Sequence, residues 1–400
     1  MVPIVFQALP KWDSAYNSTA LTISKLLSEN RKVFYIEHPF SVIDQAKPSL
    51  KDRISRRNKH NWEMPFTDHP NFIVINPLYT LPINALKEGS LYRFLLKQYI
   101  SKLWKRVDSV LSEFKIKEFG YINSFDPVYF EFESKVSCTF KIYHSVDLIS
   151  GEPYIARHGI KAEQNASKAA DFVLTTSFPL KDRLKVFNPN TECIPNAADF
   201  DHFSKDYPKP FEFRNSTRKR IVYTGNIGLR IDYQLLERVA KAHPDLDFWI
   251  IGPKDENYFG GKELESISNV YFTGAKSYKD LPASIHHADA CIIPFKCTDL
   301  TYHIYPLKLN EYLSSGKPVL TSAFTDFGKF EELMYIYKSS DEAIEKLSNA
   351  LQEPKNERIA KRIDLASENT WKNRMINWEQ VIDQLEAQIS SINQLFHRDN

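Results

Sequence analysis

The chain alternates short apolar runs with stretches in which apolar residues recur every three or four positions. Short apolar runs bounded by polar residues are typical of buried strands, and the second spacing is typical of amphipathic helices. We expect strands at residues 2–9, 32–37, 119–123, 139–143, 171–177, 220–227, 248–253, 270–274, 288–295 and 318–321. We expect helices at residues 19–27, 91–110, 163–169, 233–242, 279–287, 306–315, 339–351, 357–366 and 370–395. Strands that alternate with helices build parallel sheets covered on both faces, so the pattern predicts an α/β fold.

The number of these units is too large for one sheet. A chain of 400 residues exceeds the size of an ordinary single core. Residues 205–219 are charged and contain Pro208 and Pro210, so we expect a linker there. The sequence therefore predicts a first domain at 1–204, a second at 220–368 and a closing helix at 369–400, with a doubly wound parallel sheet in each domain.

The composition excludes several classes of protein. Hydrophobic residues make up 42% and charged residues 26%, which is ordinary for a globular protein. No apolar run is long enough to span a membrane, and the first residues lack a basic leader, so we expect a cytoplasmic protein. The 4 cysteines are scattered without metal-binding spacing. A net charge of +2 and the absence of nucleic-acid-binding motifs argue against a nucleic-acid partner.

The stretch 305–320 contains the clearest candidate for ligand binding. Pro306 suits the first position of a helix, and Gly316 suits the residue just past its end. The cap position then falls to Tyr305, which has no side-chain acceptor for the first amides. Free amides at a helix start bind anions, and Lys308 in the first turn is well placed for a phosphate. The alternative is a surface helix on which Lys308 pairs with Glu311.

The flanking strands favour the ligand site. Strands at 288–295 and 318–321 enclose this helix in a βαβ unit, and such units bind ligands at the carboxyl ends of their strands. The segment, with its pattern Pro-Leu-Lys-x-x-Glu-Tyr-Leu-x-x-Gly-Lys-Pro-Val, resembles the nucleotide-sugar site of GT-B glycosyltransferases. It is most similar to glycosyltransferase family 4 and to exopolysaccharide and teichuronic acid glycosyltransferases. This resemblance implies a GT-B architecture, in which two Rossmann-like domains face across a cleft and the last helix returns to the first domain.

The resemblance also implies roles for individual residues. In the family the helix start holds the donor diphosphate, which here corresponds to Tyr305, Pro306, Leu307 and Lys308, and Glu311 matches the glutamate that holds the nucleotide ribose. Further donor contacts are expected in the loops after Gly225 and Gly252, where both glycines could instead serve only as turns. The candidate donor contacts in these loops are Gly225, Asn226, Arg230 and Gly252. His303 occupies the position of a second glutamate in many retaining members, which leaves the stereochemical outcome open.

A second group of candidates follows the strand at 139–143. His144 and Asp147 come at its carboxyl end, where a side chain could accept the proton of a sugar hydroxyl. The segment resembles the Tyr-x-x-x-Asp stretch of xanthan-type glucuronosyltransferases, in which the aspartate is the proposed base. We therefore rank Asp147 first and His144 second as catalytic residues. The alternative is an aspartate that caps the turn before Ser150.

Two basic segments suggest a further partner. Residues 47–60 carry six Lys and Arg residues, and Asp52 is the only acidic residue among them. The expected helix at 91–110 has an apolar stripe flanked by basic side chains, and the stripe is expected to comprise Phe94, Leu95, Tyr99, Leu103 and Val107. Such segments either contact anionic lipid or leave their charges in water, and the sequence supports both interpretations about equally.

The resemblance implies a glycosyltransferase, and we expect it to need no metal ion or cofactor because the helix start and Lys308 can carry the diphosphate charge. The donor is a nucleotide-diphosphate sugar, and the acceptor is a saccharide, expected to be lipid-linked, in cell-surface polysaccharide biosynthesis. One alternative is a nucleotide-sugar epimerase or hydrolase on the same fold. Another is an inactive scaffold of a polysaccharide assembly complex, which the histidine at position 303 keeps open.

Overall fold

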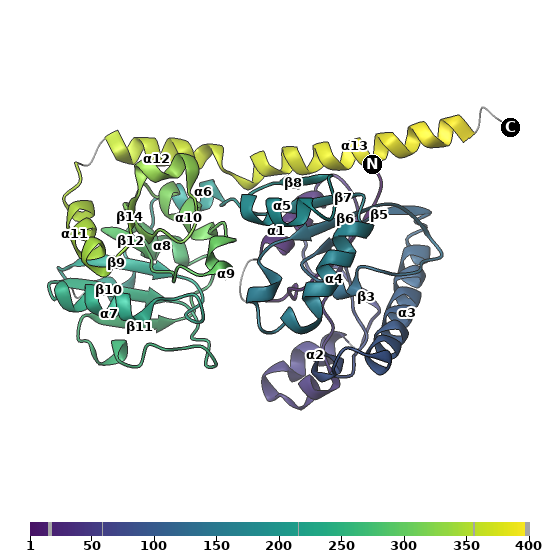
Figure 1. Ribbon diagram of the computed structural model, residues 1–400, viewed down its shortest axis with the longest axis horizontal. Helices are drawn as coiled ribbons and strands as arrows, with labels where there is room; N and C mark the ends of the chain where they lie inside the picture. Colours follow the sequence, from purple (N-terminus) through teal and green to yellow (C-terminus); the bar gives the residue numbers. More distant parts are fainter. Residues whose placement is uncertain (15–17, 58, 215, 355–356, 397–400) are drawn as a thin grey trace. The chain divides into compact units, whose positions relative to one another are not determined.

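The computed structural model describes residues 1–14, 18–57, 59–214, 216–354 and 357–396 of the chain (Figure 1). The chain divides into two compact units. Unit 1 comprises Met1–Pro195 together with Met375–Asn400, and unit 2 comprises Asn196–Arg374. The division lies earlier than the expected linker at 205–219, because helix α6 (Phe200–Ser204) packs with unit 2 through the buried ring of Phe203.

Unit 1 is built on a sheet of eight strands within the described residues, in the order β3-β4-β2-β1-β5-β6-β7-β8. Its strands are β1 (Ile4–Ala8), β2 (Val33–Glu37), β3 (Trp62–Glu63), β4 (Phe72–Ile75), β5 (Glu118–Ser124), β6 (Ser137–Ser145), β7 (Phe172–Thr175) and β8 (Thr191–Cys193). All neighbouring pairs are parallel except β3 with β4. The order reverses at β1 and β5, so their carboxyl ends form a topological switch point.

The helices of unit 1 are α1 (Thr19–Leu27), α2 (Lys51–Arg57), α3 (Ser90–Glu113), α4 (Ala156–Ala169) and α5 (Phe178–Lys185). Helix α3 packs on the sheet through buried Tyr99, Leu103, Trp104 and Val107. The expected stripe on this helix is wrong at Phe94, whose side chain is 59% exposed. Phe94 lies two positions after buried Tyr92, and two helical positions turn a side chain by about 200° to the opposite face.

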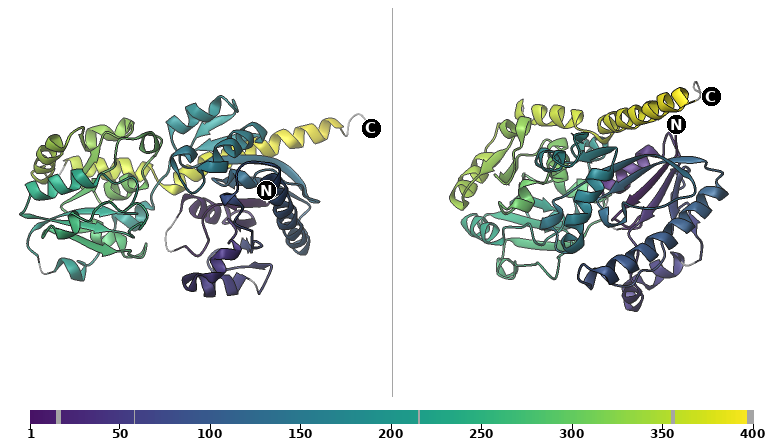
Figure 2. Two further views of the ribbon diagram at one scale, coloured as in Figure 1. Left: turned by 60° about the horizontal axis from the view of Figure 1, so that its bottom comes forward. Right: turned by 45° about the vertical axis from the view of Figure 1, so that its right-hand side comes forward.

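Helix α13 (Trp371–Phe396) runs from unit 2 into unit 1. Its Trp378 is 1% exposed and packs edge-on against His144, with the ring centroids 5.0 Å apart. Arg31 is buried and pairs with Glu379 at 2.5 Å and Glu386 at 2.7 Å. The N-terminal segment lies beside this helix in both views of Figure 2, where the backbone amide of Val2 donates to Glu386. The last helix thus closes one face of unit 1.

Unit 2 has a wholly parallel sheet of six strands within the described residues, in the order β11-β10-β9-β12-β13-β14. Its strands are β9 (Lys219–Thr224), β10 (Leu246–Ile251), β11 (Val270–Gly274), β12 (Ala290–Ile293), β13 (Val319–Ser322) and β14 (Tyr335–Tyr337). Besides α6, its helices are α7 (Tyr233–Ala242), α8 (Leu281–His286), α9 (Asp299–Tyr302), α10 (Leu307–Ser314), α11 (Ser340–Leu351) and α12 (Glu357–Glu368). The switch point of this sheet lies between β9 and β12.

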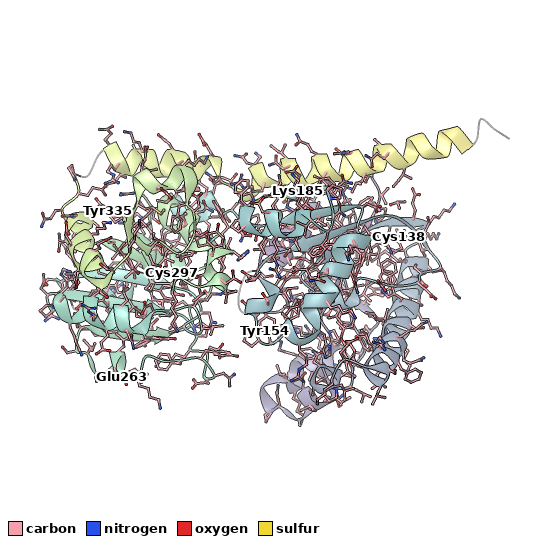
Figure 3. All side chains as sticks on the ribbon, viewed as in Figure 1. Cys138, Tyr154, Lys185, Glu263, Cys297 and Tyr335 are labelled. Atoms are coloured by element: carbon pink, nitrogen blue, oxygen red, sulfur yellow. The ribbon has the colours of Figure 1, made fainter. Side chains whose placement is uncertain are left out.

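Three further features concern the cysteines, membrane-spanning helices and groups of metal-binding side chains. The four cysteines carry free thiols, and Figure 3 labels Cys138 in unit 1 and Cys297 in unit 2. In the part of the chain that the structure describes, no helix combines the length and the apolar character that crossing a bilayer requires. Within the same residues, no His, Cys, Asp and Glu side chains come together in a group that could hold a metal ion.

Candidate functional site

Glycines end the three strands on one side of the switch point in unit 2. Gly225, Gly252 and Gly274 follow or end β9, β10 and β11, and all three have positive φ angles. A Cβ on Gly252 would lie 1.8 Å from the carbonyl oxygen of Gly225, so only glycine fits there. Gly225 donates its amide to Ile251 at 2.8 Å. No side chain projects from the backbone at these three positions, so a ligand can approach the backbone closely.

Helix α10 brings its first turn to the same edge. The hydroxyl of buried Tyr312 accepts a hydrogen bond of 2.8 Å from the amide of Thr224, the last residue of β9. Pro306 is the cap residue, one position later than expected, because its ψ of 119° lies outside the helical range. It provides no side-chain cap, so the expectation of a helix start with uncapped amides holds. Gly316, with φ of 69°, ends the helix as predicted.

Lys308 lies directly against the bare backbone of Gly225. A Cβ on Gly225 would come within 2.5 Å of Cε and 2.7 Å of Nζ of Lys308. The ammonium group also lies 5.5 Å from the ring centroid of Tyr223 and 5.4 Å from that of Phe295. Both rings belong to the strands or strand ends at the switch point, and they restrict where the cation can go. A positive charge is thus held where phosphates bind in this class of sheet.

Glu311 lies one turn further along α10. Its side chain is half-buried, and burial raises the pKa of its carboxyl group from 4.5 to about 7, against the opposing charge of Lys308. A carboxylate that is enclosed by protein yet reachable from solvent can accept hydrogen bonds from ligand hydroxyls. Because its pKa is raised, the charged form is held at a cost in the absence of a ligand.

The remaining predicted donor contacts lie in the surrounding loops. Asn226 is exposed, and its carbonyl accepts from the Tyr223 hydroxyl at 2.8 Å. The carbonyl of Arg230 accepts from the amide of Lys296 at 2.9 Å, which ties the loop after β9 to the end of β12. His303 caps the end of α9, and its Nδ1 donates to the carbonyl of Asp299 at 2.7 Å. The carbonyl of Tyr305 accepts from Asn196 at 3.1 Å, which fixes the segment before α10.

The two catalytic candidates of unit 1 differ in accessibility. Asp147 follows β6 and is half-buried, at the carboxyl edge of the sheet. His144 is 1% exposed beneath Trp378, and burial lowers the pKa of its imidazole from 6.5 to about 3. Its Nδ1 is 2.9 Å from the hydroxyl of Ser124. This geometry favours Asp147 as the group that can reach a substrate.

Comparisons with known proteins agree with this geometry. The family model described as "Glycosyl transferases group 1" matches residues 218–353. The matched residues lie within unit 2. A putative teichuronic acid biosynthesis glycosyltransferase of Bacillus subtilis, TuaH, is 28% identical over 156 residues, which are 38% of this chain. The match spans 39% of the length of that relative.

Solved structures match nearly the whole chain. Sucrose-phosphate synthase from Thermosynechococcus elongatus is 14% identical with a TM-score of 0.69, covering 97% of this chain and 100% of that chain. HepE of Anabaena, in complex with UDP and glucose, is 14% identical with a TM-score of 0.63, covering 96% and 100%. An α,α-trehalose-phosphate synthase from Burkholderia xenovorans is 11% identical with a TM-score of 0.67, covering 96% and 99%. Likeness at these identities shows the fold, which is the predicted α/β GT-B fold.

The structure also assembles a group that the sequence did not reveal. At the switch point of unit 1, Asp126 is 1% exposed and accepts from Nε2 of Gln7 at 3.0 Å. Nδ1 of His38 lies 3.1 Å from the same carboxylate, and the His38 side chain is 26% exposed. Lys11 donates to the carbonyl of His38, and burial lowers the pKa of its ammonium group to about 8. A histidine oriented by a carboxylate is an arrangement for proton transfer.

Several basic side chains of the first basic segment, residues 47–60, form ion pairs with acidic side chains and are not simply left in water. Arg57 is 4% exposed and forms ion pairs with Glu37 and Asp13, and the Asp13 carboxylate also receives Arg53 and Arg56. Burial disfavours the charged form of Asp13, but the hydrogen bonds from Arg53 and Arg57 outweigh it and hold its pKa well below the usual range. Arg53 and Arg57 therefore join α2 to the ends of β1 and β2.

Proposed function

We propose that the protein transfers a sugar from a nucleotide-diphosphate donor to a lipid-linked saccharide acceptor in cell-surface polysaccharide biosynthesis. The observation that carries the proposal is the Lys308 ammonium group held against the Gly225 backbone at the switch point, with Glu311 one turn further along the same helix. The relatives lend support, since TuaH is described as a teichuronic acid biosynthesis glycosyltransferase and HepE has been solved with UDP-glucose.

In this proposal the diphosphate and the ribose of the donor each bind to side chains of complementary charge or hydrogen-bonding capacity. The diphosphate lies at the start of α10, where Lys308 and Arg230 balance its charge, so that transfer requires no metal ion. Glu311 accepts hydrogen bonds from the ribose hydroxyls, each worth about 1.5–3 kcal/mol. Tyr305, Pro306, Leu307, Asn226, Gly252 and His303 line the path of the donor.

The acceptor binds to unit 1 in this proposal, and Asp147 removes the proton from its attacking hydroxyl. A carboxylate at the end of a parallel strand is placed where such sheets bind their ligands. The His38–Asp126 pair is the second group in unit 1 with the chemistry for this step. We place the enzyme in the cytoplasm, where contact with anionic membrane would bring it to a lipid-linked acceptor.

Donor turnover measured with and without an acceptor tests the proposal. We expect one nucleotide sugar of a panel to release its nucleoside diphosphate much faster when saccharides carried on alkyl chains are added. Turnover that does not depend on acceptor would instead identify an epimerase or hydrolase. If no nucleotide sugar binds or turns over, the protein is a scaffold, and the glycosyltransferase assignment is wrong.

A further inference from the structure

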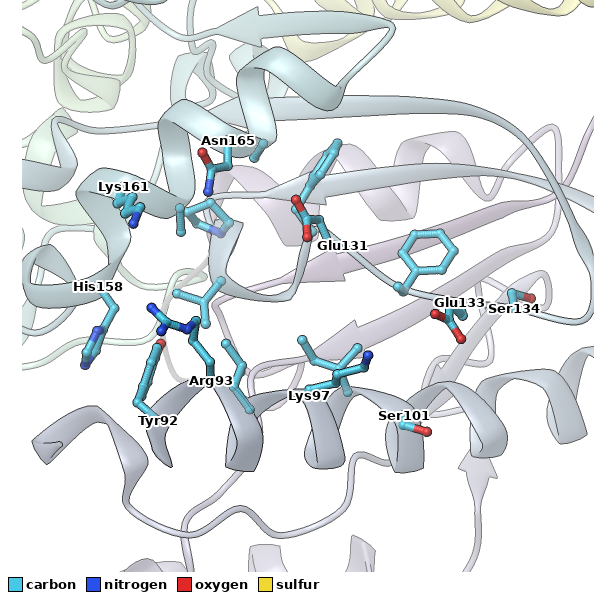
Figure 4. Close-up of a pocket in the computed structure, with 18 of the residues that line it drawn as sticks. Tyr92, Arg93, Lys97, Ser101, Glu131, Glu133, Ser134, His158, Lys161 and Asn165 are labelled. Carbon is cyan, nitrogen blue, oxygen red and sulfur yellow. The ribbon is translucent and has the colours of Figure 1, made fainter. Parts of the chain in front are cut away.

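Unit 1 contains a large cavity that is separate from the groups described above. It has a volume of about 790 Å³ and lies between helix α3, helix α4 and the segment 127–135 that follows β5. Figure 4 shows side chains of α3 pointing toward those of α4 and of this segment. The volume is within the range of pockets that hold small organic ligands, about 300–1,000 Å³.

The floor of the cavity is apolar. Leu96 and Ile100 of α3 line it together with Val128 and Phe132, and all four are only partly buried. Phe132 is held rigidly, because its ring stacks on buried Trp104 with the centroids 3.6 Å apart and an angle of 7° between the planes. Apolar surface that stays in contact with water gains free energy when a hydrocarbon chain covers it.

One end of the cavity is polar and positively charged. Tyr92, Arg93, His158 and Lys161 gather there, at the beginnings of α3 and α4 (Figure 4). Arg93 pairs with Glu88 at 3.1 Å, and Glu88 also lies 3.5 Å from His158. Among the described residues, no carboxylate forms an ion pair with Lys97 or Lys161. Glu133 and Ser134 line the cavity toward its other end, and Glu131 lies between. The carboxylate of Asp108, which also lines the cavity, accepts from the Ser134 hydroxyl at 2.6 Å.

A buried hydroxyl group at this end, that of Tyr92, has no hydrogen-bond partner among the described residues. The rings of Tyr92 and His158 stack with centroids 3.8 Å apart, and these residues are only 4% and 8% exposed. Nε2 of His158 donates to the carbonyl of Leu86 at 3.1 Å. In the described part of the chain the Tyr92 hydroxyl has no hydrogen-bond partner, whereas Nδ1 of His158 lies 3.5 Å from a carboxylate oxygen of Glu88. A buried hydroxyl group is rarely left without a partner unless a ligand or water satisfies it.

We infer that this cavity binds an amphiphile, with its hydrocarbon chain on the apolar floor and its phosphate group at the Tyr92–His158 end. Arg93, Lys97 and Lys161 supply the positive charge that a phosphate requires, and the Tyr92 hydroxyl supplies a donor. Leu91 and Phe94 lie in the first turns of α3, outside the cavity lining, and are 61% and 59% exposed, which gives this end of the helix an apolar surface suited to contact with lipid. The inference rests on the proposed function, because it assigns the lipid part of the acceptor to this cavity.

Calorimetric titration of the full-length protein with decyl phosphate, below its micellar concentration and without nucleotide, tests the inference. We expect saturable binding of one molecule per chain. Octyl phosphate should bind about tenfold more weakly, because two fewer methylene groups are buried. Inorganic phosphate should show no binding at the same concentrations. Equal affinity for inorganic phosphate would leave only an anion site, and the absence of any binding would overturn the inference.

Substitutions test whether decyl phosphate binds in the cavity. Ala162→Trp fills it from α4 and should weaken decyl phosphate binding at least tenfold, whereas Ala169→Trp, on the exposed side of the same helix, should leave it unchanged. Ser101→Trp fills the cavity from α3 and serves if Ala162→Trp fails to fold. Arg93→Ala with Lys161→Ala should also weaken binding about tenfold, and Lys102→Ala with Lys168→Ala is the matched control. Wild-type affinity in both cavity-filling variants would overturn the inference.

The outcome is separable from that of the proposed function. A nucleoside diphosphate titrated into the same samples reports on unit 2 alone. If the nucleotide binds and decyl phosphate does not, the donor site stands and the amphiphile site is wrong. If decyl phosphate binds and no nucleotide does, the cavity is a lipid site of a protein that is not a glycosyltransferase.

Discussion

Glu311 is the residue at which stability and function conflict most clearly. Its carboxyl group has a pKa of about 7 in the folded protein, against 4.5 for an ordinary glutamate, because the fold encloses it. Folding therefore favours the protonated form. The stability that this preference contributes is fully present below pH 4.5 and is lost as the pH rises through 7. A residue that served stability alone would not carry its charge at this position.

Glu311→Gln should therefore stabilise the protein at pH 8 by about 1–3 kcal/mol and have little effect at pH 5. The measurement is thermal or denaturant unfolding of both proteins at the two pH values. Glu345→Gln, an exposed glutamate on α11, is the matched control and should change neither. An equal gain at both pH values would show that the carboxylate is not held in a costly charged state.

Individual residues also mark the limit of what sequence could predict. The motif around Lys308 and Glu311 was visible because both residues lie on one short helix with clear start and stop signals. The ion pairs of Arg57 were not visible, since Asp13 and Glu37 lie 44 and 20 positions away and meet it only after the strands pair. Asp126 and His38 were missed for the same reason, although His38 follows directly on β2 and Asp126 comes two residues after β5.

At the scale of elements, strand β6 places the two catalytic candidates in different surroundings. Successive side chains of a strand point to opposite faces, so Tyr143 joins the core beneath α3 and α4 while His144 faces α13. Sequence predicted the strand and its polar end, but the side on which α13 packs is a tertiary feature. Asp147 lies beyond the last paired residue and escapes this burial.

Asp147→Asn should accordingly lower turnover by 10²–10⁴-fold, the usual range for loss of a general base, and leave nucleotide affinity nearly unchanged. His144→Ala should reduce stability rather than the turnover of the folded protein, because it removes packing against Trp378. Steady-state kinetics and unfolding of both variants check this. Loss of turnover in His144→Ala alone would move the assignment to the histidine. Normal turnover in both would direct attention to His38 and Asp126.

At the scale of the whole molecule, the central strands of both sheets followed from the alternation of apolar and amphipathic stretches, whereas the outer strands β3, β4, β8 and β14 were not predicted. In each sheet, the candidate functional residues lie near the carboxyl ends of the strands at the switch point. In unit 2 these are glycines, Lys308 and Glu311, and in unit 1 they are a network of charged side chains. The division between the units was predicted less well, because the short helix α6 packs with unit 2 although it precedes the charged linker.

The central claim is that unit 2 binds the diphosphate and ribose of a nucleotide through α10, and calorimetric titration with a panel of nucleoside diphosphates tests it most directly. We expect one of them to bind the wild-type protein. Lys308→Ala and Glu311→Ala should each weaken that binding at least tenfold, since each removes charge-assisted hydrogen bonds worth about 1.5–3 kcal/mol, while Glu345→Ala binds as the wild type does. Unchanged affinity in the folded Lys308→Ala and Glu311→Ala variants would contradict the account.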